Sequence, residues 1–237
     1  VNSSGATALT VGNNAQVTIH SIRVRGGRSI SGSATVTPVP VTGAASVADP
    51  MLALTEPVFT ACNFNNFVAS GTVTLQPGTY CNGIRLNANA QATFASGNYL
   101  IYGGGLITGN NSRLTGSAVT IFIAVGGSIT MNSTTIVNLT APTSGTYAGI
   151  AIFESRSVPL GVASHTIPIA NTGRLEGVVY TPRSALQITG VGATPANSSA
   201  RALALVSRTL RLTGRLRINY DPHYVADPLR QRAWLGE

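Results

Sequence analysis

A unit of short, apolar-alternating segments broken by Gly, Asn or Ser recurs along this chain and constrains its fold more than any other feature. The clearest copies are IRLNANAQATF, LITGNNSRLTG and ITMNSTTIVNL, which begin 22 and 23 residues apart at Ile84, Leu106 and Ile129. A Gly or Asn lies three positions after each leading apolar residue, at Asn87, Gly109 and Asn132, and also at Gly12 after Leu9. Weaker copies begin at Ile167, Leu186 and Leu210.

A period near 20 residues that consists of strands and turns, without helical periodicity, is typical of a β-solenoid. A single coil cannot bury its own apolar face, so successive coils must stack and share one core. Alternation turns every second side chain inward, and Asn or Gly at the corners supplies the left-handed backbone conformations of sharp bends. A β-sandwich also has short, regularly spaced strands, but it does not require turn residues at a repeated offset. We therefore expect an all-β solenoid of about ten coils.

The repeat predicts a single domain over residues 1–237, with three departures from the pattern. Residues 38–59 carry four prolines and are expected to form an irregular surface excursion. Residues 154–164 interrupt the repeat and are expected to form a loop. Residues 221–237 abandon the alternation, and we expect this tail to cap the exposed strand edges at the end of the solenoid.

The two cysteines, Cys62 and Cys81, are 19 positions apart and lack the spacing of a zinc site. One interpretation is a disulfide that closes a loop of about 20 residues and contributes about 3 kcal/mol, which favours an extracytoplasmic location. The other is a pair of buried free thiols. No apolar run approaches the ~18 residues of a membrane-spanning helix.

Catalytic chemistry finds little support among the seven acidic residues. Glycoside hydrolysis generally requires two carboxylates about 5–10 Å apart. Glu154 and Glu176 are 22 residues apart, which is the repeat itself, and they are the only pair that could stack; we interpret both as outward-facing turn residues. The three histidines, His20, His165 and His223, lie far apart and share no ligand spacing. We predict no catalytic residues, no metal site and no cofactor.

Arginine is the one chemical asymmetry, since lysine is absent and the net charge is +8. In TLRLTGRLRINY, the apolar residues share one parity and are expected to point inward. Arg211, Arg215 and Arg217 share the other parity and, with Arg208, form the predicted surface for an anionic partner such as acidic polysaccharide. Nucleic acid is disfavoured because no aromatic residues are interleaved with these arginines. The alternative is a solvated strand face whose charge prevents edge-to-edge aggregation.

Several motifs in order resemble the C-terminal region of TadG-like proteins, which accompany bacterial tight-adherence (Flp) pilus assembly. They include VNSSGATALTVGNNAQVT, then TVTLQPGTYCNGIRLNANAQATFASGNYLIYGGGLITGN, and YAGIAIFESRS. In that family both cysteines recur in this context, one of them in a PGxYCxG turn. The resemblance implies a right-handed, single-stranded parallel β-helix on the extracytoplasmic side of the membrane, usually behind a transmembrane helix, and it implies no catalytic residues.

Together these observations lead to the hypothesis of a non-enzymatic structural or adhesive module of the cell surface or pilus. Its expected partners are other surface or pilus proteins, with acidic polysaccharide as a further partner. One alternative is a pectin-lyase-like, carbohydrate-active or carbohydrate-binding β-helix. A second is a self-polymerising extracellular filament, since uncapped coils can associate end to end.

Overall fold

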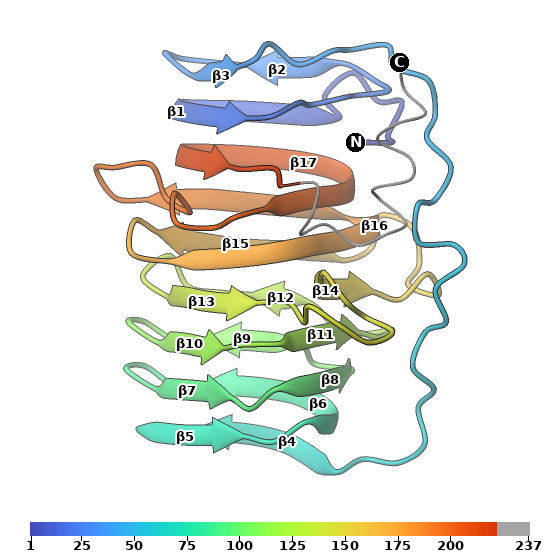
Figure 1. Cartoon of the computed structure of the whole chain (residues 1–237), viewed down its shortest axis with the longest axis vertical. Coiled ribbons are helices and arrows are strands. Elements are labelled where there is room, and N and C mark those ends of the chain that lie inside the picture. Colours follow the sequence, from blue (N-terminus) through green and yellow to red (C-terminus); the bar gives the residue numbers. More distant parts are fainter. Residues whose placement is uncertain (222–237) are drawn as a thin grey trace.

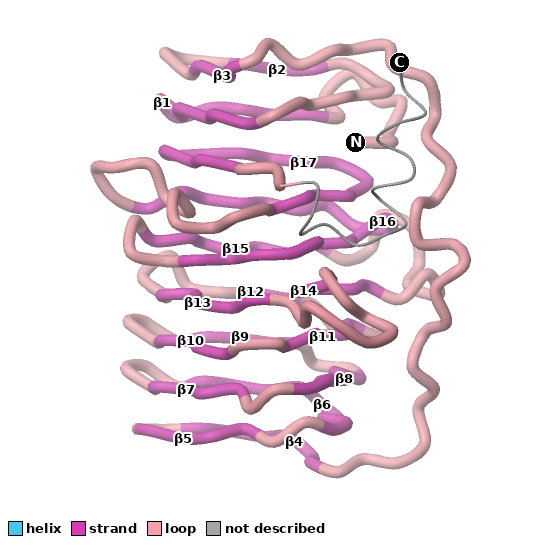
Figure 2. Tube along the Cα trace, viewed as in Figure 1, coloured by secondary structure: helices cyan, strands magenta, loops and turns pink. Residues whose placement is uncertain are grey.

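The computed structural model describes residues 1–221, and in that range the chain is all-β and contains no helix (Figures 1 and 2). All described strands belong to one 17-stranded sheet. Its strands are β1 (Leu9–Ile19), β2 (Arg28–Ile30), β3 (Thr35–Thr37), β4 (Phe64–Ala69), β5 (Thr72–Leu75), β6 (Gly78–Leu86), β7 (Gln91–Phe94), β8 (Gly97–Tyr102), β9 (Leu106–Thr108), β10 (Arg113–Gly116), β11 (Val119–Ile123), β12 (Ile129–Thr130), β13 (Ile136–Thr140), β14 (Ile150–Glu154), β15 (Ser164–Ala170), β16 (Arg174–Val191) and β17 (Leu203–Ile218).

The strands stack as parallel rungs along the long axis of the molecule (Figure 1). Each strand pairs with the strands about one repeat before and after it, as β7 pairs with β10 and β10 with β13. The predicted repeat positions are in register, because Ile84 lies beside Leu106 and Leu106 beside Ile129. The arrangement is consistent with the predicted β-solenoid.

Each coil bends twice, so the stack has three faces that the pairing registers define. The first face contains β8, β11, β14 and residues 177–181 of β16 and 203–207 of β17. The second face contains β9, β12, β15 and residues 185–190 of β16 and 209–214 of β17. The third face contains β7, β10, β13 and residues 174–176 of β16 and 215–218 of β17.

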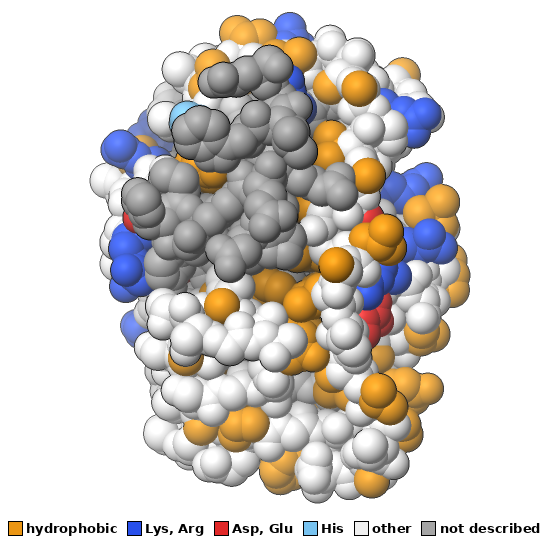
Figure 3. Space-filling view, turned by 45° about the vertical axis from the view of Figure 1, so that its right-hand side comes forward, with side chains coloured by type: hydrophobic (Ala, Val, Ile, Leu, Met, Phe, Trp, Pro, Cys, Tyr) orange, Lys and Arg blue, Asp and Glu red, His pale blue; other side chains and the backbone are white. Residues whose placement is uncertain are grey.

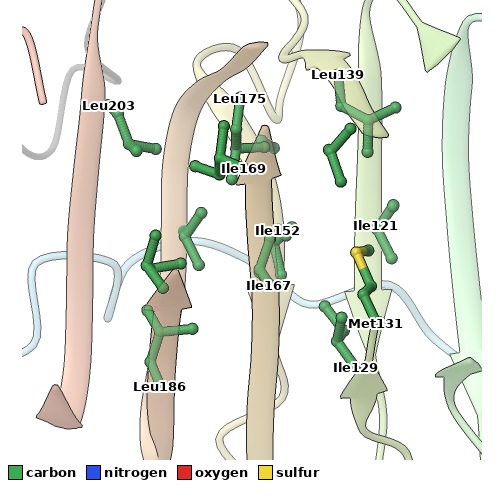
Figure 4. Packing of buried hydrophobic residues seen from close by; sticks show 14 of the residues in the cluster. Ile121, Ile129, Met131, Leu139, Ile152, Ile167, Ile169, Leu175, Leu186 and Leu203 are labelled. Atoms are coloured by element: carbon green, nitrogen blue, oxygen red, sulfur yellow. The ribbon is translucent and has the colours of Figure 1, made fainter. Parts of the chain in front are cut away.

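The core lies inside the coils and consists of ladders of aliphatic side chains from equivalent positions. On the second face Leu186 lies beside Leu210, and Leu210 beside Leu9, all fully or almost fully buried. Figure 4 shows side chains such as Ile129 and Ile167 directed into the space between the strands. Burial of each such side chain contributes about 1.5–3 kcal/mol, so stacking rather than any single coil supplies the stability.

The sharp bends are made by asparagines, two positions later than the repeat suggested. Asn14, Asn89 and Asn111 adopt the left-handed conformation, with φ of 56°, 62° and 54°. The predicted corner residues Gly12, Asn87 and Gly109 do not have positive φ. The expectation that Asn serves the corners is confirmed, but the predicted positions were wrong. β6 ends at Leu86 and β9 at Thr108, so Asn87 and Gly109 open the turn and the left-handed residue follows two positions later.

The two ends of the described chain meet in the stack, an arrangement that the repeat did not reveal. β1 pairs in parallel with β17 over eight residue pairs, from Leu9 beside Leu210 to Ile19 beside Ile218. The first residues join the same junction, where the Ser3 amide donates to the Arg208 carbonyl at 3.1 Å. The free edge that β17 would present is therefore covered by β1. The predicted cap at 221–237 lies outside the described residues, except for Asp221.

A connecting segment, residues 45–61, runs along the side of the stack from the coil of β2 and β3 to the coil of β4 and β5 (Figure 1). We call it the strap. It overlaps the region predicted as an irregular excursion, 38–59, but begins and ends later, and it contains no strand. The strap is nonetheless packed, because Met51 is fully buried against the outer surface of the first face, in a cluster with Phe122, Phe153 and Tyr180.

The interruption predicted at 154–164 is shorter than expected, because Glu154 is the last residue of β14 and Ser164 the first of β15. Residues 155–163 form the connection between these strands. The coil that follows begins two residues earlier than predicted. His165, rather than Ile167, lies beside Leu186 at the inward position of the ladder.

Candidate functional site

The predicted arginine surface is divided by a bend. Arg211, Arg215 and Arg217 are exposed, while Leu212 and Leu216 between them are buried, as the alternation indicated. Gly214 has a φ of 71°, and the register with β1 shifts there, so Arg211 lies on the second face and the other two on the third. Arg208 lies apart from them, half-buried, where its guanidinium faces Gly161.

Arg211 differs from the two arginines after it in having no polar partner among residues 1–221. Arg215 donates to the carbonyl of Ala193, and Arg217 donates to the Asn219 side-chain oxygen at 3.0 Å. Arg211 instead borders a shallow groove of about 280 Å³ on the outer surface of the second face. The groove is lined by Met131, Ser133, Thr166, Pro168, Gln187, Thr189, Arg211 and Thr213. The sequence indicated the exposure of Arg211 but not the groove.

Glu154 is fully buried, which overturns its interpretation as an outward-facing turn residue. Its carboxylate accepts hydrogen bonds from the Ser184 hydroxyl and from the Arg183 amide, the latter at 3.0 Å. The Nε2 atom of His165, also fully buried, lies 3.0 Å from the same carboxylate. The sequence had no signal for this meeting of three polar side chains, because they come from three different strands or turns.

The Glu154, His165 and Ser184 group does not have the geometry of a nucleophilic triad. The serine hydroxyl bonds the carboxylate rather than the imidazole. The Nδ1 atom of His165 accepts from the backbone amide of Ile129 at 3.1 Å, so Nε2 carries the proton that bonds Glu154. A general base needs a free lone pair facing its nucleophile. Full burial and this bonding make the group a structural polar network in the corner of the core.

Glu176 is also buried rather than turned outward, and it does not stack on Glu154. It lies beside Thr140 on the third face, whereas Glu154 ends a strand of the first face. Arg174 donates to its carboxylate at 2.6 and 2.9 Å, and Arg201 at 3.0 and 3.1 Å. Two guanidinium groups thus neutralise one buried carboxylate, as burial of a charge requires.

Two further carboxylates, from Asp49 and Glu56, attach the strap to the first face through Arg156. The Arg156 Nε atom lies 3.0 Å from Glu56, and its two terminal nitrogens donate to the carbonyls of Met51 and Leu54 at 2.7 Å. Asp49 accepts from the Tyr180 hydroxyl at 2.7 Å. Burial first, and then this hydrogen bond, raise the pKa of Tyr180 well above its usual value.

A cavity of about 280 Å³ lies between the strap and the first face. Its wall is mainly apolar and includes Leu100, Phe122 and Phe153, and its rim includes the stacked rings of Phe59 and Tyr102, whose centroids are 4.6 Å apart. Cys81, which lies beside Tyr102 on the neighbouring strand, forms a disulfide with Cys62 at a Cα–Cα distance of 5.6 Å. The bridge decides between the two interpretations left open by the sequence and ties the end of the strap to β6.

The outer surface combines basic and uncharged polar character. On the side shown in Figure 3, basic side chains lie mainly in the upper half, while the lower half carries uncharged polar and apolar side chains. Within residues 1–221, no group of three or more His, Cys, Asp or Glu side chains is arranged to hold a metal ion. The same range includes no helix with the length and apolarity that a membrane crossing requires.

Comparison with protein-family models, with curated proteins and with solved structures found no match. The resemblance to TadG-like proteins therefore stays a prediction that rests on the quoted motifs.

Proposed function

We propose that this chain is a non-enzymatic structural or adhesive module of the bacterial surface, associated with tight-adherence (Flp) pilus assembly. In this proposal it forms a right-handed, single-stranded β-helix of about ten coils outside the cytoplasm. The Cys62–Cys81 disulfide supports such a location, because disulfides persist in oxidising compartments. Its partners are other surface or pilus proteins, or an acidic polymer.

One observation carries the proposal: four acidic groups of residues 1–221 are buried or paired with arginine, while other arginines face outward. Glu154 and Glu176 are fully buried, and Asp49 and Glu56 are bound to Arg156. Arg211, Arg215 and Arg217 remain exposed on a stack of parallel strands. Since a rigid scaffold keeps such charges in fixed positions, the surface is suited to holding an anionic partner rather than to transforming one.

The filament alternative is favoured by one specific feature, the two ends of the stack. Among residues 1–221, β4 and β5 pair on one side only, with β6 and β7, and β2 and β3 pair only with β1. Such edges can accept a further strand. However, Pro38 and Pro40 follow β3 and cannot donate backbone hydrogen bonds at that edge.

The proposal is tested by deleting the gene in the bacterium that carries it and counting surface-attached cells. We expect deletion to reduce attachment, and the native gene to restore it. A variant with Arg211, Arg215 and Arg217 changed to Ser should be exported in equal amount but restore attachment poorly. The charge-matched control changes Arg25, Arg85 and Arg113 to Ser and should restore attachment fully. Unimpaired attachment after deletion would overturn the proposal, and so would release of sugar fragments from polysaccharide by the purified protein.

A further inference from the structure

The groove on the second face is built from two outward columns that run along the axis of the stack. In one column Thr166 lies beside Gln187, Gln187 beside Arg211, and Arg211 beside Thr10. Neighbouring members of a column are separated by the interstrand spacing of about 4.8 Å. A chain molecule that lies along the axis therefore meets a hydrogen-bonding side chain at every step.

The second column forms the floor of the groove. Pro168 lies beside Thr189, and Thr189 beside Thr213. The hydroxyls of the two threonines are 2.9 Å apart, and Gln187 donates to Thr189 at 3.3 Å. The column ends at Gly12, which is buried and faces the Ser31 hydroxyl, so the groove closes toward β1. The floor thus offers fixed hydroxyl groups beside the apolar ring of Pro168.

The charge in the groove has one sign. Arg211 is exposed and has no polar partner among the described residues, and every residue lining the groove besides Arg211 is uncharged. A guanidinium group in this state can bind a carboxylate through two parallel hydrogen bonds. Because no aromatic side chain lines the groove, it lacks the stacking platform with which proteins hold single-stranded nucleic acid.

These observations point to a single ligand chemistry, which combines carboxylates, many hydroxyls and apolar ring faces in a linear polymer. We propose that the groove binds an acidic polysaccharide rich in uronic acids, with the glycan along the stack axis. In this arrangement Arg211 holds a uronate carboxylate, Thr166, Gln187 and Thr189 bond sugar hydroxyls, and Pro168 contacts a ring face. The inference rests on the proposed function, since it names what the outward surface holds.

The test is titration calorimetry of the purified chain with tetragalacturonate, and with maltotetraose as the neutral counterpart. We expect tetragalacturonate to bind and maltotetraose to bind at least about tenfold more weakly. Arg211→Gln should raise the Kd for tetragalacturonate about tenfold or more, since a charge-assisted hydrogen bond is lost. Arg211→Lys should raise it less, because the charge stays while the two-pronged contact is lost. The matched control Arg113→Gln, on the third face and outside the groove, should leave the Kd within about twofold.

Equal binding of both tetrasaccharides, or an Arg211→Gln variant that binds like the native chain, would overturn the inference. Tighter binding of poly-glutamate than of tetragalacturonate would also overturn it, in favour of an acidic peptide. Failure of this inference is distinguishable from failure of the proposed function. If tetragalacturonate does not bind but attachment still depends on the three arginines, only the glycan assignment is wrong. If it binds through Arg211 but gene deletion leaves attachment unchanged, only the surface role is wrong.

Discussion

Leu210 of β17 lies directly beside Leu9 of β1, in parallel register and in the same buried ladder, although the two residues are near opposite ends of the chain. The junction between them has the same backbone hydrogen bonding and the same inward alternation as the junctions between consecutive coils. Coils of this chain therefore stack on one another whether or not the chain connects them directly.

The junction predicts a cross-link. Thr18 and Arg217 are directly paired, and paired Cα atoms of adjacent strands are close enough for a disulfide. We expect the Thr18→Cys/Arg217→Cys variant to form an intramolecular disulfide that runs faster on a non-reducing gel. Either cysteine alone should leave the mobility unchanged. A double variant that stays reduced under oxidising conditions, or that forms only dimers, would contradict the register of β1 and β17.

The buried network predicts a non-additive pair of substitutions. His165→Leu places an aliphatic residue in an aliphatic ladder, but it removes the histidine partner of the buried Glu154 carboxylate. We expect a loss of about 1–3 kcal/mol in the free energy of unfolding, since the buried carboxylate loses a hydrogen-bond donor and the Ile129 amide loses its acceptor. Adding Glu154→Met should recover part of that loss, as measured by urea denaturation. A double variant less stable than His165→Leu alone would show that the network stabilises the coil by another route.

Arg156 is predicted to hold the strap. Arg156→Met removes the donors to the Met51 and Leu54 carbonyls and the ion pairs to Asp49 and Glu56. Because these groups are partly exposed, we expect a modest loss of about 1–3 kcal/mol. We also expect faster proteolytic cleavage and amide exchange within residues 45–61. Arg85→Met, on an exposed outward position, serves as the control and should change neither. Unchanged exchange in the Arg156 variant would place the attachment of the strap elsewhere.

Buried tyrosines predict a loss of stability at alkaline pH. Burial raises the pKa of Tyr80, whose hydroxyl donates to the Gln76 carbonyl at 2.7 Å, to about 12. An unfolded tyrosine ionises near pH 10. Between about pH 10 and pH 12 the unfolded state has therefore lost a proton that the folded state keeps, so the free energy of unfolding falls as pH rises. Below pH 10 both states keep the proton, so Tyr80 causes no loss in the free energy of unfolding there.

The alkaline effect is measured by urea denaturation at a series of pH values. Burial also raises the pKa of Tyr99 and, together with the Asp49 hydrogen bond, that of Tyr180, so the slope should exceed that of one tyrosine. Tyr80→Phe should make the slope shallower. A stability profile that stays flat between pH 10 and pH 12 would contradict burial of these hydroxyl groups.

The sequence predicted the register of the central coils because their signal is local. Ile84, Leu106 and Ile129 stand at the start of alternating segments of similar length, and stacking requires these positions to coincide. The prediction of register failed at His165. A polar residue can be assigned to an inward position only when its buried partner, here Glu154, is known. The spacing of the repeats did not reveal the pairing of β1 with β17. That pairing arises because the strap carries the chain along the side of the stack, so that the later coils build back toward β1.

The candidate site was predictable only where its signal, too, was local. Alternation placed Arg211 outward, but the bend at Gly214, which separates it from Arg215, depends on the register with β1. Glu176 was misassigned because its burial depends on Arg201, which comes from the next coil, although its other partner Arg174 is only two residues away on the same strand. Short-range patterns therefore located the exposed arginines, while a charge pair between coils is recognisable only in the stack.

The covering of β17 by β1 has a consequence for how the molecule is made. During synthesis β1 leaves the ribosome before the other described strands, and its neighbour β17 leaves after them. The coils from β4 onward can add one at a time to those already formed, whereas β1 cannot dock until β17 has been made. Pairings between such distant segments form slowly. Docking of the first segment onto the finished rungs is thus expected to be the last and slowest event of folding.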